Sequence, residues 1–147
     1  MTSQRQELAT LLSEVSQDAL QLGEEDAKYE VTTYTSPVEI EKYCILNRID
    51  VLFTVRRGQC TAGRYLQDVP HRKITDYTVG VWCIYTDGSR AADYQSLRDA
   101  AVAEVQRLLK ANPSVAREKN LQGDDDHRHG AVYILNTNLT VSKKTYS

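Results

Sequence analysis

The sequence predicts one α+β domain, residues 1–147, with a mainly antiparallel sheet of four to five strands and two amphipathic helices. Three observations carry this prediction. Every second position over residues 77–85 carries an apolar or aromatic side chain, which is the period of a strand. Residues 94–109 repeat apolar side chains at helical spacing. Asp87 and Gly88 supply turn chemistry between them, so a strand feeds a helix that packs on the sheet.

The N-terminal segment predicts the first helix, over residues 3–22, followed by a strand. Gly23 supplies the helix stop. The apolar side chains that share one side of this helix are Leu8, Leu11, Leu12, Val15, Ala19 and Leu22. Tyr29, Val31 and Thr33 then alternate, which predicts a strand over residues 28–35.

Residues 36–45 are compatible with two structures. Ser36, Pro37 and Glu39 stand in the order of cap, first turn and third position that begins a helix. Residues 38–41 alternate between apolar and acidic side chains, as a half-buried strand does. We favour a strand or an irregular connection here.

The middle of the chain predicts two antiparallel strands joined by a long loop. Clean alternation predicts the first strand over residues 47–56, and Cys44 and Ile45 are candidates for extending it backwards. The second strand covers residues 73–85. The loop, about residues 57–73, has two Gly, one Pro and no sustained period, and loops of this length are usually functional or mobile.

The C-terminal third predicts the second helix, another long loop and a closing strand. The helical stripe consists of Tyr94, Leu97, Ala101, Val105, Leu108 and Leu109, and Asn112 and Pro113 end the helix. Residues 114–130 are polar and without a period. Residues 131–141 alternate again, so the expected order is α-β-(β)-β-β-α-β.

Composition excludes several classes of protein. Hydrophobic residues at 41% and charged residues at 26% are ordinary for a soluble domain, and a net charge of −2 gives no global case for a nucleic-acid or membrane partner. No apolar run is long enough to span a membrane, and no signal peptide is expected. Three separated Cys indicate reduced thiols, so synthesis in a cytoplasm is expected.

Charge is distributed unevenly along the chain. Residues 1–50 hold 4 Lys or Arg against 10 Asp or Glu, a balance of −6, and residues 51–147 hold 14 against 10, a balance of +4. An acidic front and a basic back suit head-to-tail contact between copies, although solvated surface charge gives the same pattern.

The densest cluster of chemically active side chains is an Asp/His segment near the end. It consists of Asp124, Asp125, Asp126, His127 and His129. Carboxylates and imidazoles at this spacing can bind a transition metal, but three adjacent Asp in a loop point in different directions. A solvated loop and a charged contact with a neighbouring subunit remain the other interpretations, and the subunit contact is the candidate role we assign.

Asp50 raises the possibility of a metal-dependent nuclease. Some nucleases place an Asp at the start of a strand and a Glu-x-Lys on the next strand, so that carboxylates hold Mg²⁺. The strand at 73–85 has no Glu-x-Lys, and Glu39, Glu41 and Lys42 precede Asp50 instead. The match is therefore weak, and neither the Cys nor the His residues have a local catalytic signature.

The long loop near residues 57–73 is basic. It carries Arg56, Arg57, Arg64, Arg72 and Lys73 against Asp68 alone. Such a segment can contact a phosphate backbone, an acidic protein surface or water. We assign these five residues as candidates for contact with a subunit, a tail tube or DNA.

The layout of the chain resembles the tail terminator (tail completion, head-to-tail joining) proteins of long-tailed phages and related viruses. The likeness covers about residues 1–145 and rests on the strands IDVLFTV and TDYTVGVWCIYTDG, the helix ending in LLKANP and the strand AVYILNTNLTV. It implies a ring, usually of six subunits, that ends the tail tube and meets the neck, with DNA passing through the lumen without sequence-specific contact. It implies no catalytic residues and no cofactor.

Three hypotheses follow from the sequence. The first is a structural virion protein, not an enzyme, that forms a homo-oligomeric ring at the tail–neck junction and contacts the tail tube protein and the neck or connector protein. The second is a metal-dependent nuclease or hydrolase using Asp50 and the Asp/His segment. The third is a small intracellular binding module without a ring.

Overall fold

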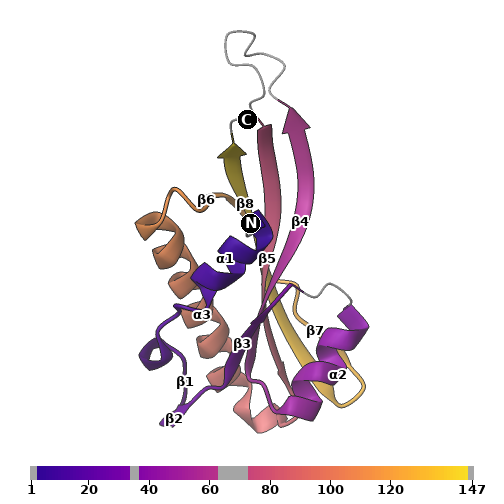
Figure 1. Cartoon of the computed structure of the whole chain (residues 1–147). Coiled ribbons are helices and arrows are strands. Elements are labelled where there is room, and N and C mark those ends of the chain that lie inside the picture. The colour runs from indigo at the N-terminus through magenta and orange to yellow at the C-terminus, as the bar shows by residue number, and fades with distance from the viewer. Residues whose placement is uncertain (1–2, 34–36, 63–72, 146–147) are drawn as a thin grey trace.

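The computed structural model describes residues 3–33, 37–62 and 73–145, and it places helices on both faces of a mixed sheet (Figure 1). The elements in chain order are α1 (Gln4–Leu12), a 3-10 turn (Gln17–Ala19), β1 (Gln21–Leu22), β2 (Glu25–Asp26), β3 (Tyr29–Thr32), α2 (Pro37–Asn47), β4 (Val51–Ala62), β5 (Lys73–Tyr85), a second 3-10 turn (Gly88–Arg90), α3 (Ala91–Ala111), β6 (Arg117–Leu121), β7 (His127–His129) and β8 (Val132–Thr145). The predicted α+β class is confirmed.

The main sheet described has six strands, in the order β3-β4-β5-β8-β6, and β7 also pairs with β8. Only β3 is parallel to its neighbour, β4; the other pairings are antiparallel. β1 and β2 form a separate two-stranded hairpin. The sheet is thus mainly antiparallel, as predicted, with β6 and β7 beyond the expected strands.

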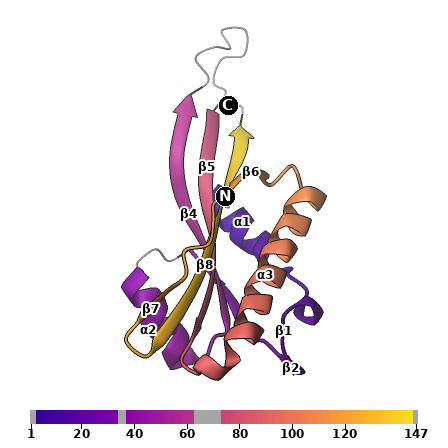
Figure 2. The ribbon, with the colours of Figure 1, turned by 180° about the vertical axis from the view of Figure 1, so that it is seen from behind.

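The two faces of the sheet carry separate cores. One face packs against α1 and α3, and all six residues of the predicted α3 stripe are buried there. The other face packs its lower half against α2, through Ile40 and Cys44 on Leu52 and Ile84. Figure 2 shows α3 and α2 on opposite sides of the strands. Alternation along each strand explains both cores, because successive side chains point to opposite faces.

The upper ends of β4 and β5 project beyond the helices (Figure 1). β3 pairs with β4 only over residues 51–54. Over residues 55–62, β4 has β5 on one side and no other described strand on the second side. This segment, the β4 edge, is therefore an open sheet edge within the described part of the chain.

The predicted helix over residues 3–22 was too long, because α1 ends at Leu12. The later apolar residues Val15, Leu20 and Leu22 are buried without helical structure. Tertiary contacts satisfy the backbone instead: the Tyr29 hydroxyl donates to the Val15 carbonyl oxygen at 2.8 Å, and the Ser16 N–H donates to a Glu104 carboxylate oxygen at 3.0 Å. These partners replace the missing helical bonds.

The preference for a strand or irregular connection over residues 36–45 was wrong, since Pro37–Asn47 is helix α2. The backward extension of β4 through Cys44 and Ile45 is wrong for the same reason, and β4 begins at Val51 rather than residue 47. Burial of Ile40 and Cys44, four residues apart, favours the helix because both reach the sheet from one helical face.

Both predicted long loops contain strand. β4 continues to Ala62 and β5 begins at Lys73, so only residues 63–72 of the first loop, with Arg64 and Arg72, lie outside the described residues. The second loop, 114–130, contains β6 and β7. All their side chains are exposed, so they have no hydrophobic period; backbone pairing with β8 makes them strands.

Candidate subunit-contact surfaces

The β4 edge carries the two described arginines of the basic segment. Arg56 and Arg57 are exposed and consecutive, so they lie on opposite faces of the strand. Neither makes an ion pair with a described residue. Arg57 lines a hollow of about 370 Å³ with Arg5 and Tyr77 beside the start of α1. Both cations are therefore available to a partner. The Lys73 side chain is not described.

A bulge interrupts the β4 edge between Arg57 and Cys60. Gly58 lies in this bulge, where a Cβ would come within 3.2 Å of the Asp76 carbonyl oxygen. Bulges and charged side chains on an open edge restrict indiscriminate strand pairing. The edge thus combines backbone groups that are not paired by a second described strand with features that select among partners.

The Asp/His segment is divided between two environments. Arg98 of α3, whose side chain is 7% exposed, reaches Asp126 at 2.6 Å and Asp124 at 3.3 Å. Asp124 also accepts a hydrogen bond of 2.7 Å from the Thr137 hydroxyl. Asp124 and Asp126 therefore share one cation within their own chain, so Arg98 holds both carboxylates in place but the cluster keeps a net negative charge.

The other three members of the segment are more accessible. The Asp125 side chain is 76% exposed and lies 3.9 Å from a His127 ring nitrogen. His129 is 78% exposed and lies 3.2 Å from Glu41 of α2. Within the described part of the chain, no group of three or more His, Cys, Asp or Glu side chains is placed to hold a metal ion.

Arg98 is a residue that sequence reasoning missed. It lies four residues after Tyr94 and three before Ala101, both in the buried stripe. A charged residue at that spacing on a buried face needs a partner. The helical period alone therefore predicts that Arg98 needs a partner, but the tertiary structure is what identifies Asp124 and Asp126 as that partner.

The Asp50 carboxylate connects separate parts of the fold through hydrogen bonds to both of its oxygens. One carboxylate oxygen accepts from the Lys28 N–H at 2.8 Å, and the other accepts from the Tyr94 hydroxyl at 3.0 Å. Burial, followed by the Asp50 charge, raises the Tyr94 pKa. The Asp50 carboxylate thus joins β4, α3 and the chain entering β3.

The described thiols are not poised as nucleophiles. Cys44 and Cys83 are both free and buried. Burial raises the pKa of Cys44 to about 12 and also raises the pKa of Cys83. Both therefore stay protonated near neutral pH, whereas a nucleophilic cysteine needs its thiolate form. Cys83 is a small side chain within the main core.

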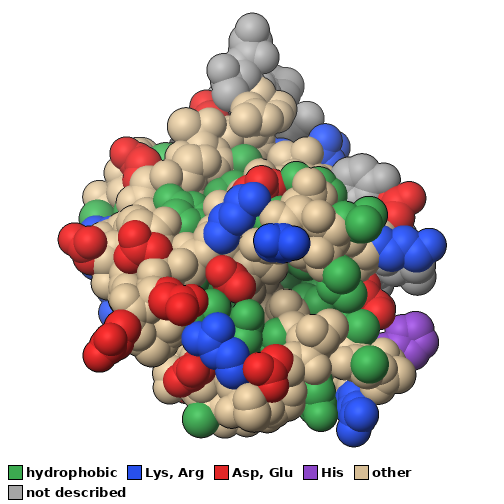
Figure 3. Space-filling model, turned by 90° about the horizontal axis from the view of Figure 1, so that it is seen from below, with side chains coloured by type: hydrophobic (Ala, Val, Ile, Leu, Met, Phe, Trp, Pro, Cys, Tyr) green, Lys and Arg blue, Asp and Glu red, His purple; other side chains and the backbone are tan. Residues whose placement is uncertain are grey.

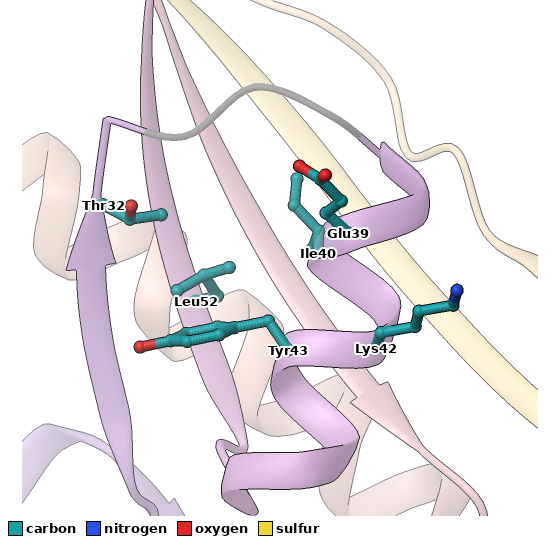
Figure 4. A pocket seen from close by; sticks show the side chains of 6 residues that line it. All are labelled: Thr32, Glu39, Ile40, Lys42, Tyr43 and Leu52. Atoms are coloured by element: carbon teal, nitrogen blue, oxygen red, sulfur yellow. The ribbon is translucent and has the colours of Figure 1, made fainter.

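A pocket of about 370 Å³ lies between α2 and the first two strands of the main sheet (Figure 4). The residues that line this α2 pocket are Thr32, Glu39, Ile40, Lys42, Tyr43 and Leu52. In Figure 4 the Tyr43 ring lies along Leu52, and Lys42 points away from Thr32 and Leu52. The Tyr43 hydroxyl donates to Glu30. Sequence reasoning missed this pocket because it depends on α2 being a helix.

Large apolar side chains are exposed at a few described positions. On α2 these are Tyr43 and Ile45, both 42% exposed, and Leu46, 81% exposed. The fourth is Leu121 of β6, 45% exposed. The lower end of the molecule intersperses acidic, basic and apolar side chains (Figure 3). The sequence-level separation of charge is therefore incomplete on this face.

No known protein-family model matches this chain, and no curated protein matches its sequence. Among the described residues, no helix is long and apolar enough to cross a membrane.

Proposed function

We propose that this protein is a structural subunit of a virion, which forms a homo-oligomeric ring at the tail–neck junction, ends the tail tube and joins it to the head. The observation that carries the proposal is the β4 edge, where residues 55–62 pair with one strand only among the described strands. An open edge is a template for pairing with another chain. The resemblance of the chain's layout to tail terminators supports the ring and its position at the tail–neck junction as parts of this proposal.

Self-assembly into a ring requires two unlike surfaces on each subunit, because a head-to-tail contact joins different patches. The exposed cations Arg56 and Arg57 supply one kind of surface. Exposed carboxylates near the start of the chain, on Glu24, Glu25 and Asp26, supply the other sign. This charge separation supports heterologous contact and favours a closed ring over a symmetric dimer.

The partners of such a ring are other copies, the tail tube protein and the neck or connector protein. Arg56 and Arg57 also suit DNA that passes through the lumen, since contacts between arginine and phosphate carry no sequence information. Arg64, Arg72 and Lys73 belong to the same proposed contact. No cofactor and no catalytic step enter this function.

Charge reversal on the β4 edge tests the proposal. Native mass spectrometry and negative-stain imaging of wild type are compared with Arg56→Glu/Arg57→Glu, with and without purified tail tubes. Lys110→Glu, an exposed cation at the end of α3, is the matched control. We expect rings from wild type and the control, and loss of assembly in the double variant. Wild type that neither self-associates nor adds to tubes refutes the function.

The alternative classes give different results in the same preparations. A metal-dependent nuclease or hydrolase would show activity that Asp50→Ala, or His127→Ala with His129→Ala, abolishes. A binding module would stay monomeric. For a ring protein without a catalytic step, the same changes have no enzymatic activity to abolish, and the two His side chains, 50% and 78% exposed, can be replaced without disturbing the core.

A further inference from the structure

The face of the main sheet that carries α2 changes character halfway along the strands. Its lower half is apolar and packs against α2, and the Trp82 indole nitrogen there donates to the Thr54 hydroxyl at 3.0 Å. Figure 1 shows α2 beside the lower parts of the strands. No described helix covers the upper half of this face, since α1 and α3 pack on the opposite face.

Strand register defines which side chains this upper half presents. Thr78 of β5 alternates with Tyr77 and Val79, which lie in the core beneath α1 and α3, so Thr78 and its directly paired neighbours point to the other face. One row across the sheet consists of Arg56, Thr78, Thr140 and Asn120, and the row above it contains Asp76, Ser142 and Arg117. None of these side chains is apolar. With Lys119, whose place is given next, they form what we call the upper polar face.

Cations lie at both borders of the upper polar face. Arg56 lies on β4 and Arg117 on β6, and both are exposed. Lys119 lies in the bulge of β6 and reaches Asp76 at 3.0 Å, so it belongs to the same face. The Lys119 side chain is 58% exposed and that of Asp76 only 16%, so the cation lies outward of the carboxylate. Three cations against one carboxylate leave this face a charge of +2.

The side-chain types of the upper polar face suit a duplex backbone better than a protein or a single strand. Phosphate and sugar oxygens are bound by Arg, Lys, Ser, Thr and Asn, which are the types found here. Protein interfaces have apolar and aromatic centres, and single strands stack their bases on aromatic rings. The upper polar face has no aromatic side chain, and Trp82 packs against the α2 core below it.

The spacing of the cations also suits phosphates. Three strand spacings of about 4.8 Å separate β4 from β6, so the two borders are about 14 Å apart. Successive phosphates of one duplex strand are about 3.4 Å apart along the axis, so this width matches about four nucleotides. Asp125, an exposed carboxylate on the β8 border, lies about 14 Å farther down, because its N–H donates to the carbonyl oxygen of Asn136, four residues before Thr140. It therefore lies outside the proposed contact.

We propose that the upper polar face binds the sugar–phosphate backbone of duplex DNA without reading its sequence. Arg56 on one border and Arg117 and Lys119 on the other contact phosphates. Lys119 exchanges Asp76 for a phosphate, since an ion pair with an exposed Lys contributes little. This inference deepens the proposed function and rests on it, because DNA that passes through a ring must meet one face of each subunit. It assigns that role to this face and adds Arg117 and Lys119, which sequence reasoning missed.

DNA binding by variants with altered charge tests the proposal. Fluorescence anisotropy of a labelled duplex of about 20 base pairs and mixed sequence is measured between about 50 and 200 mM salt. The variants are Arg56→Gln and the double change Arg117→Gln/Lys119→Gln. Arg5→Gln is the matched control, because Arg5 is an exposed cation in the hollow on the opposite face. Asp76→Asn is the converse variant, since it removes the carboxylate of the upper polar face. Circular dichroism checks that each variant is folded.

We expect the logarithm of the wild-type affinity to fall with the logarithm of salt concentration, with a slope of about −3 per bound subunit, since each phosphate contact contributes about −0.9. Each cation removed should lower the size of the slope by about 1 and weaken binding by about 10-fold at about 50 mM salt. Arg5→Gln should bind as wild type does. Asp76→Asn should bind more tightly, and this gain separates lost contacts from lost folding.

Two results would overturn the DNA assignment. One is an affinity that Arg56→Gln and Arg117→Gln/Lys119→Gln leave unchanged. The other is displacement of the duplex by polyglutamate as readily as by unlabelled duplex, which points to an acidic protein surface instead. Rings that do not bind the duplex also overturn this inference and leave the proposed ring standing. Binding with the expected variant effects, from a chain that never assembles, supports the binding face and overturns the ring.

Discussion

Replacement of Arg98 by Met should destabilise the fold and release the segment that carries Asp124 and Asp126. The Arg98 guanidinium is the cation that holds both carboxylates against α3, and its side chain is 7% exposed. Met keeps the aliphatic length and removes the charge. The variant therefore isolates the ion-pair cluster from the packing of the helix.

The expected loss follows from the contacts. Hydrogen bonds to charged groups contribute about 1.5–3 kcal/mol, and breaking a fully buried pair costs about 3–5 kcal/mol. Here Asp124 is 54% and Asp126 34% exposed, so both regain water when Arg98 is removed. Asp99, 74% exposed, adds little. We therefore expect a loss of about 2 kcal/mol in the free energy of unfolding.

Urea unfolding and amide hydrogen exchange measure the two consequences. The Asp125 N–H donates to the Asn136 carbonyl oxygen at 2.8 Å, so its protection reports whether the segment stays docked. Arg98→Met should lose this protection by more than its drop in global stability explains. Asp99→Ala is the control, with a change below about 0.5 kcal/mol. Unchanged stability and unchanged Asp125 protection in Arg98→Met would refute the role of Arg98 in holding Asp124 and Asp126 against α3.

Three further predictions concern other parts of the fold. Gly80→Ala would place a Cβ 2.6 Å from Trp82 Nε1, so we expect a loss of about 1–3 kcal/mol and a shift in the emission of this single Trp, measured by fluorescence during urea unfolding. Arg48 has a left-handed φ of 53°, so Arg48→Gly should stabilise by about 1 kcal/mol, whereas Arg48→Ala should not; equal melting temperatures for both would contradict the strain. The Glu104 pKa is lowered below 4.5, mainly by the hydrogen bond from Arg107, so its stabilisation is present above that value and is lost as pH falls below it. The stability difference between wild type and Glu104→Gln should therefore shrink in acid, and a difference that stays constant down to the lowest pH of folding would contradict this.

Strong periodicity made the central strand and helix predictable. Tyr77 to Tyr85 alternate and form part of β5, and all six stripe positions from Tyr94 to Leu109 are buried in α3. In these segments local preference and tertiary burial agree, so the sequence carries enough information by itself. The residues between these alternating positions, Trp82 and Ile84, lie on the second face of the sheet, where they belong to the smaller core that α2 forms.

Where the local signals conflict, only the tertiary structure decides. Residues 38–41 alternate as a strand does, and α2 forms because Ile40 and Cys44 reach the second sheet face together. β6 and β7 bury no side chains, so they have no hydrophobic alternation. They are strands because their backbones pair with β8, and the local sequence carries no signal of that pairing. The ion pair between Arg98 and Asp126 and the α2 pocket are also products of tertiary structure, because each brings together segments far apart in the chain.

The most direct test of the central claim is the native mass of the purified wild-type protein, measured from low to high concentration together with negative-stain images. We expect closed rings of about six copies with a central hole, at high concentration or on tail tubes. A protein that remains monomeric at every concentration, and that leaves tail tubes unchanged, would contradict the proposed ring.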